Sequence, residues 1–471
     1  MNIPGTIKIN FTGGIVSPGD LYNILVAAGN HGCSRVRFGL RQQLILESEA
    51  VVQPALQQEL STLGVISESN LDAYPNITSS FCAEEVFITR NWLSEGVYKD
   101  ILQGFDFRPE LKVNISDSNQ SFTPLLTGNI NWVASPATPH YWHCFIRFPK
   151  TNIIYEAGCC VYTNDLPRAT ACIESALLAG LRDGAAVFAI VRKQSFLLLE
   201  DPPALALPPF NLPYYEGLNR YNDKYWLGIY RREEWFSVAF LKALCLLCLR
   251  TRVGQFCITS WKSVIVKSIE EKDRPLWNEL LAKHQLNMRH AANELNFQVE
   301  DHSTEALALK QFLVKRLNDT DCRTFGICFG IKTRPRSEVF SNILVRRKPW
   351  IRIGPWTMVY RYDICCSEDF NPNKRTAWVF SKNNPRWLLP EQLRRAVLAF
   401  YQWQLASIAL PAPEKPKEKR KQPVWAQQCG ECLSVYDGET EAGGLLPADA
   451  HCALCEAPHS SFNRVDLNSL S

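Results

Sequence analysis

The sequence predicts an α+β protein, with a large body built as a twofold repeat and a small metal-binding module at its C-terminal end. Three observations carry this prediction. A helix followed by a strand occurs twice, about 220 residues apart. A stretch rich in proline and lysine divides the chain near its end, and two Cys-x2-Cys pairs follow it. A chain of 471 residues is also too long for one hydrophobic core, so several compact units are expected.

The first copy of the repeat begins with a helix that Ser17 caps and that ends near Gly29. A strand is predicted over residues 35–47. In the second copy a helix is predicted over residues 233–251 and a strand over residues 255–269. A repeat of this size indicates duplication of a large α+β unit.

Composition indicates an ordinary soluble chain, with 46% hydrophobic and 21% charged residues. No apolar run approaches the roughly 18–20 residues that span a bilayer. Residues 1–5 show no signal-peptide pattern. Most of the seventeen cysteines are scattered in apolar stretches, where reduced cysteine packs as a small hydrophobe. We therefore expect a reducing, cytoplasmic compartment and no membrane partner.

Charge is divided unevenly along the chain. Residues 424–471 hold seven acidic residues and one arginine, a net charge of −6, whereas residues 1–410 carry +7. This division suggests that the acidic end docks electrostatically on a basic surface. The body has no dense basic stripe with interleaved aromatic residues, so nucleic acid is not an expected partner.

Cys429, Cys432, Cys452 and Cys455 form two Cys-x2-Cys pairs separated by nineteen residues. Each pair directs two thiolates from one tight turn towards a shared point, so two pairs complete a tetrahedral sulfur cage for one ion. Such a cage suits zinc or iron, and the spacing alone slightly favours zinc.

The flanks of these pairs resemble rubredoxins. Residues 432–438 include a Tyr-Asp pair after the first knuckle, and residues 455–462 include Ala-Pro followed by Phe. The segment between the knuckles is shorter than in rubredoxins, and Ala453 replaces their usual proline. The resemblance implies one iron ion and one-electron transfer, with a structural zinc ribbon as the alternative.

In the body, Arg35, Arg37 and Arg41 alternate with apolar residues. On a single strand they share one face, and arginine holds carboxylates and phosphates with two parallel hydrogen bonds. A solvated strand face is the simpler alternative.

The body resembles sirohaem-dependent nitrite and sulfite reductases in the order of several short motifs. They are Arg35-Val-Arg37-Phe-Gly-Leu-Arg41-Gln42, Pro75-Asn76-Ile77, Leu111 to Ser116, Asn164-Asp165-Leu166-Pro167, and Ile258 to Val266. The resemblance implies that Arg37 contacts a sirohaem carboxylate, with Arg41 at the same cofactor site, and that Lys112 faces a bound oxyanion. At two positions where this family has a basic residue, the sequence has Pro75 and Glu110 instead.

The same family holds a [4Fe–4S] cluster through Cys-x5-Cys followed by Cys-x3-Cys. Cys322 and Cys328 have the first spacing, but Cys365 and Cys366 are adjacent, and Asp369 stands where the last ligand belongs. We therefore do not expect the cluster and favour structural burial of these cysteines.

The predicted domains follow from these comparisons. They are a ferredoxin-like half-domain (1–68), a reductase-like module (69–205), a second half-domain (206–290), a second, degenerate module (291–410), a charged linker (411–423) and a rubredoxin-like domain (424–471).

The expected function is one-electron transfer by a rubredoxin iron attached to a reductase-like body, as an electron-transfer or accessory component of nitrite or sulfite reduction. Its partners would be a redox protein, either donor or reductase, and a small oxyanion. The alternatives are a sirohaem-dependent reductase in its own right and a non-redox zinc-ribbon interaction protein.

Overall fold

The structure is a computed structural model whose chain divides into two compact units, Met1–Trp403 and Gln404–Ser471. It describes residues 5–49, 51–70, 72–87, 92–334, 339–353, 356–409, 425–432, 434–436 and 449–466. We call the first unit the body and residues 425–466 of the second unit the head. The predicted linker, residues 411–423, lies outside the described residues.

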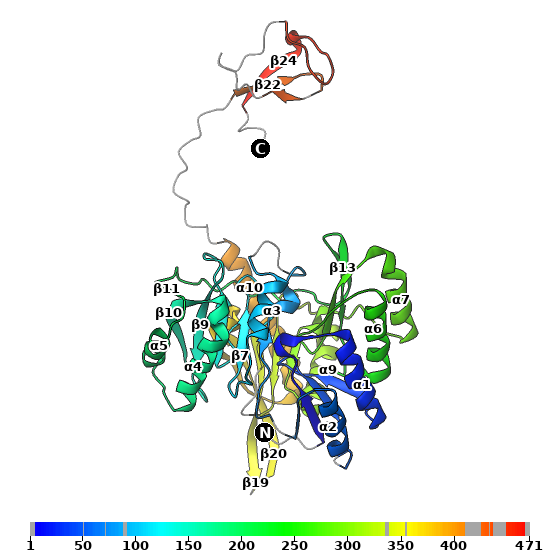
Figure 1. Ribbon diagram of the computed structural model, residues 1–471, viewed down its shortest axis with the longest axis vertical. Coiled ribbons are helices and arrows are strands. Elements are labelled where there is room, and N and C mark those ends of the chain that lie inside the picture. The colour runs from blue at the N-terminus through cyan, green and yellow to red at the C-terminus, as the bar shows by residue number, and fades with distance from the viewer. Residues whose placement is uncertain are drawn as a thin grey trace. The chain divides into compact units, whose positions relative to one another are not determined.

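The described residues of the body form four β-sheets (Figure 1). Two belong to the half-domains, with strand orders β14-β3-β4-β1-β5 and β12-β13-β16-β15-β2. Their strands are β1 (Thr6–Ile9), β2 (Ile15–Val16), β3 (Arg35–Phe38), β4 (Leu44–Glu47), β5 (Ser67–Ser69), β12 (Gly217–Tyr221), β13 (Lys224–Ile229), β14 (Phe236–Ser237), β15 (Phe256–Ile258) and β16 (Val264–Ile269).

The other two sheets belong to the modules, with strand orders β11-β10-β9-β8-β7-β6 and β17-β18-β19-β20-β21. Their strands are β6 (Thr78–Ser79), β7 (Val113–Ser116), β8 (Ile130–Ala134), β9 (Tyr141–Arg147), β10 (Ile154–Tyr162), β11 (Leu198–Glu200), β17 (Phe297–Val299), β18 (Phe329–Lys332), β19 (Ile343–Ile353), β20 (Trp356–Ser367) and β21 (Ala377–Asn384). In each sheet three strands run parallel, β6-β7-β8 and β17-β18-β19, and the following strands pair antiparallel.

Helices cover these sheets and connect their strands. They are α1 (Pro18–Asn30), α2 (Gln53–Thr62), α3 (Glu95–Gln103), α4 (Leu166–Leu178), α5 (Gly184–Arg192), α6 (Val238–Arg250), α7 (Arg274–Lys283), α8 (Ala292–Leu295), α9 (Thr304–Asp319) and α10 (Leu389–Ala409). None of the helices in the described ranges is long and apolar enough to cross a membrane.

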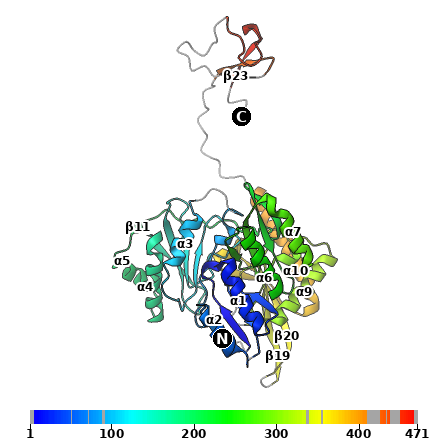
Figure 2. The same cartoon turned by 45° about the vertical axis from the view of Figure 1, so that its right-hand side comes forward.

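The two half-domains exchange strands and share one core. Strand β2 of the first half pairs with β15 of the second, and β14 of the second half pairs with β3 of the first. Each exchanged strand leads into a 13-residue helix, α1 or α6, and a serine hydroxyl, of Ser17 or Ser237, accepts a hydrogen bond from that helix's first turn. These two helices lie side by side (Figures 1 and 2). Apolar residues of both half-domains form a single buried cluster, so neither half has a separate core.

The strand predicted over residues 35–47 is a hairpin instead. Its turn is closed by hydrogen bonds from Gly39 N to Gln43 O and from Gln42 N to Gly39 O, and Gln42 has a left-handed φ of 61°. The second predicted strand, 255–269, breaks in the same way, with Lys262 at φ 56°. Because Arg41 lies in the turn, the prediction that it shares a strand face with Arg35 and Arg37 is wrong.

Strands β19 and β20 extend beyond the rest of their sheet as a two-stranded arm (Figures 1 and 2). Its two strands are 11 and 12 residues long. Trp350 and Met358 on it are 52% and 63% exposed. The arm therefore adds surface to the body and little to its core.

The described residues of the head form a three-stranded antiparallel sheet in the order β23-β22-β24. Its strands are β22 (Trp425–Cys429), β23 (Val435–Tyr436) and β24 (Phe462–Asp466). A small buried cluster of Cys429, Cys452 and Ala457 packs against Tyr436 and Phe462. Because so little apolar surface is buried, a module of this size needs a further source of stability, such as a metal ion.

Candidate metal centre

Each of the two Cys-x2-Cys pairs forms a tight turn. In the first, the backbone N–H of Cys429 donates to the carbonyl of Ser434 at 2.9 Å. In the second, the N–H of Cys452 donates to the carbonyl of Ala457, also at 2.9 Å. This shared pattern makes each pair a knuckle that presents two sulfur atoms in the same direction.

The four sulfur atoms converge as the spacing predicts, all within 4.8 Å of one another. The Sγ atoms of Cys429 and Cys455 are 3.6 Å apart, and those of Cys432 and Cys452 are 3.4 Å apart. With metal–sulfur bonds of about 2.3 Å, a tetrahedral cage has sulfur–sulfur edges of about 3.8 Å. The group could therefore hold one metal ion.

The cage has a buried side and an exposed side. Cys429 and Cys452, the first cysteine of each knuckle, are buried in the small core, whereas Cys432 and Cys455 are exposed. An ion held here would lie beneath two sulfur atoms that meet solvent.

Two hydroxyl groups surround the buried Cys452 sulfur. The hydroxyl of Ser434 lies 3.3 Å from Cys452 Sγ, and that of Tyr436 lies 3.2 Å from it. These contacts favour the thiolate, and they lower the pKa of the Cys452 thiol to about 5. Ser434 was not among the residues selected from the sequence. Its position two residues after Cys432, within the knuckle, is the signal that could have identified it.

The cofactor-binding residues predicted in the body lie in three different surroundings. The Arg41 guanidinium is buried and donates to the carbonyls of Asn76 and Val113, at 2.7 and 2.8 Å. The Arg37 guanidinium stacks 3.5 Å above the ring of Trp235, with Nε 3.4 Å from a carboxylate oxygen of Glu47.

Lys112 lines another cavity, of about 490 Å³, whereas Arg37 lines a cavity beside His302 and Arg41 lines a void of about 20 Å³. The three side chains therefore do not converge into the carboxylate-binding cradle that sirohaem needs, and as arranged they do not fit it. Their roles towards a cofactor remain predictions.

The body cysteines also lie apart from one another. Cys365 and Cys366 are consecutive residues of β20, so their side chains point to opposite faces of the sheet. Cys366 belongs to the core under one face, and Cys365 lines the Lys112 cavity on the other. The Cys328 thiol donates to the carbonyl of Phe340 at 3.0 Å. Within the described residues, the four-cysteine group of the head is the one set of three or more potential ligands close enough to share an ion.

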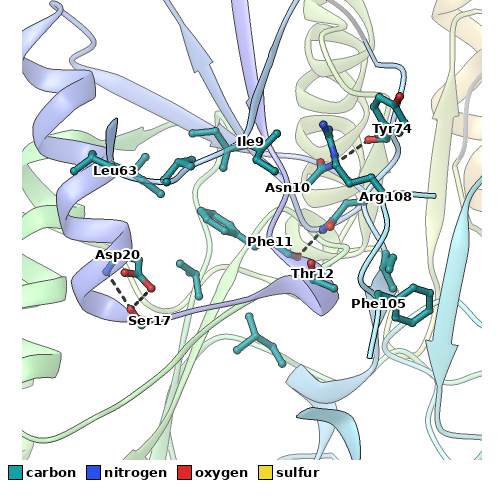
Figure 3. A pocket seen from close by; sticks show the side chains of 18 of the residues that line it. Ile9, Asn10, Phe11, Thr12, Ser17, Asp20, Leu63, Tyr74, Phe105 and Arg108 are labelled. Carbon is teal, nitrogen blue, oxygen red and sulfur yellow. Dashed lines mark hydrogen bonds between the residues drawn. The ribbon is translucent and has the colours of Figure 1, made fainter. Parts of the chain in front are cut away.

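Another cavity of the body, of about 630 Å³, lies between α1, β1 and the segment before β7 (Figure 3). Ile9, Phe11, Leu63 and Phe105 contribute to its apolar lining. Several of its polar groups are occupied locally: Ser17 and Asp20 bond each other, the Asn10 amide donates to the Tyr74 carbonyl, and Arg108 pairs with Glu68. Ser17 and Asp20 form the N-terminal cap of α1, which accounts for their contact, so we assign this cavity no chemistry.

Comparison with known proteins confirms the fold. No family model and no curated protein matches the sequence. The solved structure of the NirA protein of Mycobacterium tuberculosis is similar, with a TM-score of 0.64 at 16% sequence identity over 85% of this chain and 83% of that chain. The predicted fold class, a twofold repeated α+β body followed by a small four-cysteine module, is therefore confirmed, and the body has the fold of the NirA structure. At this identity the likeness concerns the fold alone.

Proposed function

We propose that this chain is a redox protein in which the head carries one iron ion for one-electron transfer and the body has an accessory or electron-transfer role in nitrite or sulfite reduction. The iron would cycle between Fe(III) and Fe(II), taking one electron from a donor protein and passing it to an acceptor. Four thiolates would hold it in both states.

The observation that carries this proposal is the cage itself. Two of its sulfur atoms reach solvent, so a partner protein could approach within a few bond lengths of the ion. Hydroxyl groups beside Cys452 supply hydrogen bonds to sulfur, which set the potential of an iron–thiolate centre. A purely structural zinc site has no need of either feature, although it tolerates both.

The body supports the accessory role more than catalysis. Arg41 is held by backbone carbonyls, Arg37 pairs with Glu47, and Pro75 and Glu110 replace two expected basic residues. Direct reduction of nitrite or sulfite by this chain remains a second candidate, because Lys112 lines a cavity with other basic side chains. Structural zinc in the head is the third.

Metal analysis with a visible spectrum of the purified full chain separates these functions. We expect about one iron per chain, a red Fe(III)–thiolate spectrum, and loss of both in Cys429→Ser and Cys452→Ser, because three thiolates bind the ion far more weakly. Cys322→Ser, which changes a body cysteine outside the cage, should keep the iron.

Stoichiometric zinc in protein made with ample iron would reject the redox function. Sirohaem is tested in the full chain with Cys429 and Cys432 both changed to serine, which removes the colour of the head. Expressed in a host that makes sirohaem, this variant should be colourless. A sirohaem spectrum that Arg37→Ala abolishes would establish the reductase alternative instead.

A further inference from the structure

A pocket lined by five basic side chains lies between the sheets of the two modules. It encloses about 490 Å³, and its basic residues are Lys112, Arg147, Lys150, Lys332 and Arg375. None of the described residues that line it is acidic. We call this cavity the basic pocket. Its volume is in the range of cavities that hold small molecules.

The floor of the basic pocket is one face of the second module's sheet. Leu344 of β19 and Cys365 of β20 are directly opposite each other in the register, so they share that face. Lys332, at the end of β18, is two residues beyond Gly330, the partner of Leu344, and projects from the same face. The strands that form this floor are held by the core beneath them, so Lys332 has a fixed position.

The rim comes from the first module. Arg147, at the end of β9, donates to the carbonyls of Gly128 and Thr127 at 3.0 and 2.8 Å, which fixes its side chain at the edge of the pocket. Lys112 precedes β7, and Lys150 lies in the turn between β9 and β10. The positive charges therefore converge from segments of two different sheets.

Nearby acidic residues are engaged elsewhere. Asp363 pairs with Arg346 at 3.0 Å and with Lys348. The Glu300 carboxylate accepts hydrogen bonds from the backbone N–H groups of Thr333 and Arg334, each at 3.0 Å.

Among the described residues no carboxylate forms an ion pair with Lys332. Burial lowers the pKa of the Lys332 ammonium group. The negative charge of Glu300 raises this pKa, whereas the positive charges of Arg346 and Arg375 lower it. A bound anion would relieve this repulsion.

Two of the basic residues occupy backbone conformations that favour glycine or asparagine. Lys150 has φ 66° and Arg375 has φ 59°. Residues with long side chains are uncommon in this region, and such outliers gather where a side chain has to be directed at a ligand. Both positions lie in turns on the pocket wall.

We propose that the basic pocket binds a small organic anion with several negative charges, carried by phosphate or carboxylate groups. A single nitrite or sulfite ion would neutralise only part of the charge and leave most of the cavity empty. Sirohaem is rich in carboxylates, but the Arg37 and Arg41 side chains expected to hold them do not converge, as described above. The guanidinium groups of Arg147 and Arg375 and the ammonium groups of the three lysines together supply the positive charge that such an anion would neutralise. This proposal does not depend on which metal the head holds.

Calorimetric titration of the full chain tests the pocket, with inorganic pyrophosphate and citrate as separate probes. We expect saturable binding of one ligand per chain, at least about tenfold weaker in Lys332→Met and in Arg375→Gln, because each removes a charged hydrogen-bond donor. Tighter binding of pyrophosphate would assign a phosphate ester as the ligand, and tighter binding of citrate a polycarboxylate. Lys315→Met, an exposed lysine of α9 outside the pocket, should bind as wild type does.

Lys150→Asn separates loss of binding from loss of folding. We expect this variant to fold, because Lys150 is exposed and asparagine suits its left-handed backbone. This variant should melt as wild type does and still bind the probe more weakly. Absence of saturable binding, equal binding by all variants, or nitrite or sulfite binding as tightly as pyrophosphate would each overturn the proposal. So would sirohaem incorporation that Lys332→Met abolishes.

Discussion

The hydroxyl of Tyr436 lies 3.2 Å from the Sγ atom of Cys452 and accepts a hydrogen bond from the backbone N–H of Ala453 at 2.9 Å. Its ring packs against Phe462 with centroids 5.5 Å apart, so the hydroxyl is held in place. A metal-bound sulfur carries no proton, and Tyr436 must therefore be the donor in this pair. Tyr436, which follows the first knuckle, thus contacts both the backbone and a cage sulfur atom of the second knuckle.

Removing this hydroxyl should lower the reduction potential of the head's iron. A hydrogen bond to sulfur stabilises the more negative Fe(II) state more than the Fe(III) state. If the net difference is about 1 kcal/mol, Tyr436→Phe should shift the potential by about −40 mV. Redox titration followed by the visible spectrum measures this shift. Tyr401→Phe, which removes a hydroxyl of the body, should leave the potential unchanged, and an equal shift there would contradict the assignment.

Loss of the metal should unfold the head without affecting the body. The head's core is small, and metal binding to a four-cysteine site contributes on the order of 10 kcal/mol or more to folding. We expect Cys429→Ser, or treatment with a strong chelator, to abolish a separate head transition in calorimetry. The main transition of the body should move by less than about 1 °C, since the described body packs its own cores. A large fall in the body's melting temperature would show that the two units stabilise each other.

Much of the fold could be predicted from sequence, because helix caps and hydrophobic periodicity are local signals. The serine cap placed the start of α1 correctly, and α6 lies within the helix predicted over residues 233–251. The twofold repeat was visible for the same reason. The exchange of β2 and β14 between sheets could not be predicted, because two-residue strands carry no pattern and their partners are far away in sequence.

The candidate site shows the same limit. The four cysteines were predictable, since metal geometry restricts their spacing. The positions of the three arginines could not be predicted. The alternation of apolar and polar residues continues through the tight turn at Gln42, so the sequence resembles one long strand. The basic pocket was missed except for Lys112, since its other basic residues come from segments more than two hundred residues apart.

The turn at Gln42 gives a stability prediction for the body. The Gln42 side chain is fully buried, and its amide both donates to the Ser79 carbonyl and accepts from the Ser79 N–H, each at 2.9 Å. Gln42→Ala should lower the free energy of unfolding by about 3 kcal/mol, because both Ser79 groups would be left buried without these partners. Urea denaturation measures the loss. Gln58→Ala, at an exposed position of α2, should cost less than about 0.5 kcal/mol, and similar losses in both variants would contradict this account.

A buried carboxyl group gives the body a dependence on pH. Glu84 is 6% exposed, and its Oε1 atom accepts a hydrogen bond from the hydroxyl of Tyr98 at 3.0 Å. Burial raises the pKa of Glu84 to about 8, and the negative charge of Asp117 contributes. Tyr98 is fully buried, and its hydroxyl also contacts the hydroxyl of Ser80 at 2.8 Å.

The sign of this dependence follows from where the proton is held. The folded chain keeps Glu84 protonated up to a pH of about 8, whereas the unfolded chain releases the proton near its ordinary pKa. The stability that the neutral carboxyl supports is therefore fully present below about pH 4.5 and is lost as pH rises to about 8. Glutamine at this position cannot ionise, so Glu84→Gln should gain stability relative to wild type as pH rises, reaching about 4 kcal/mol near pH 8 and changing little above it. Urea denaturation between about pH 5 and 9 measures the difference, and Glu279→Gln, at an exposed position of α7, serves as the control. A difference that stays constant with pH would mean that Glu84 is already ionised in the folded protein.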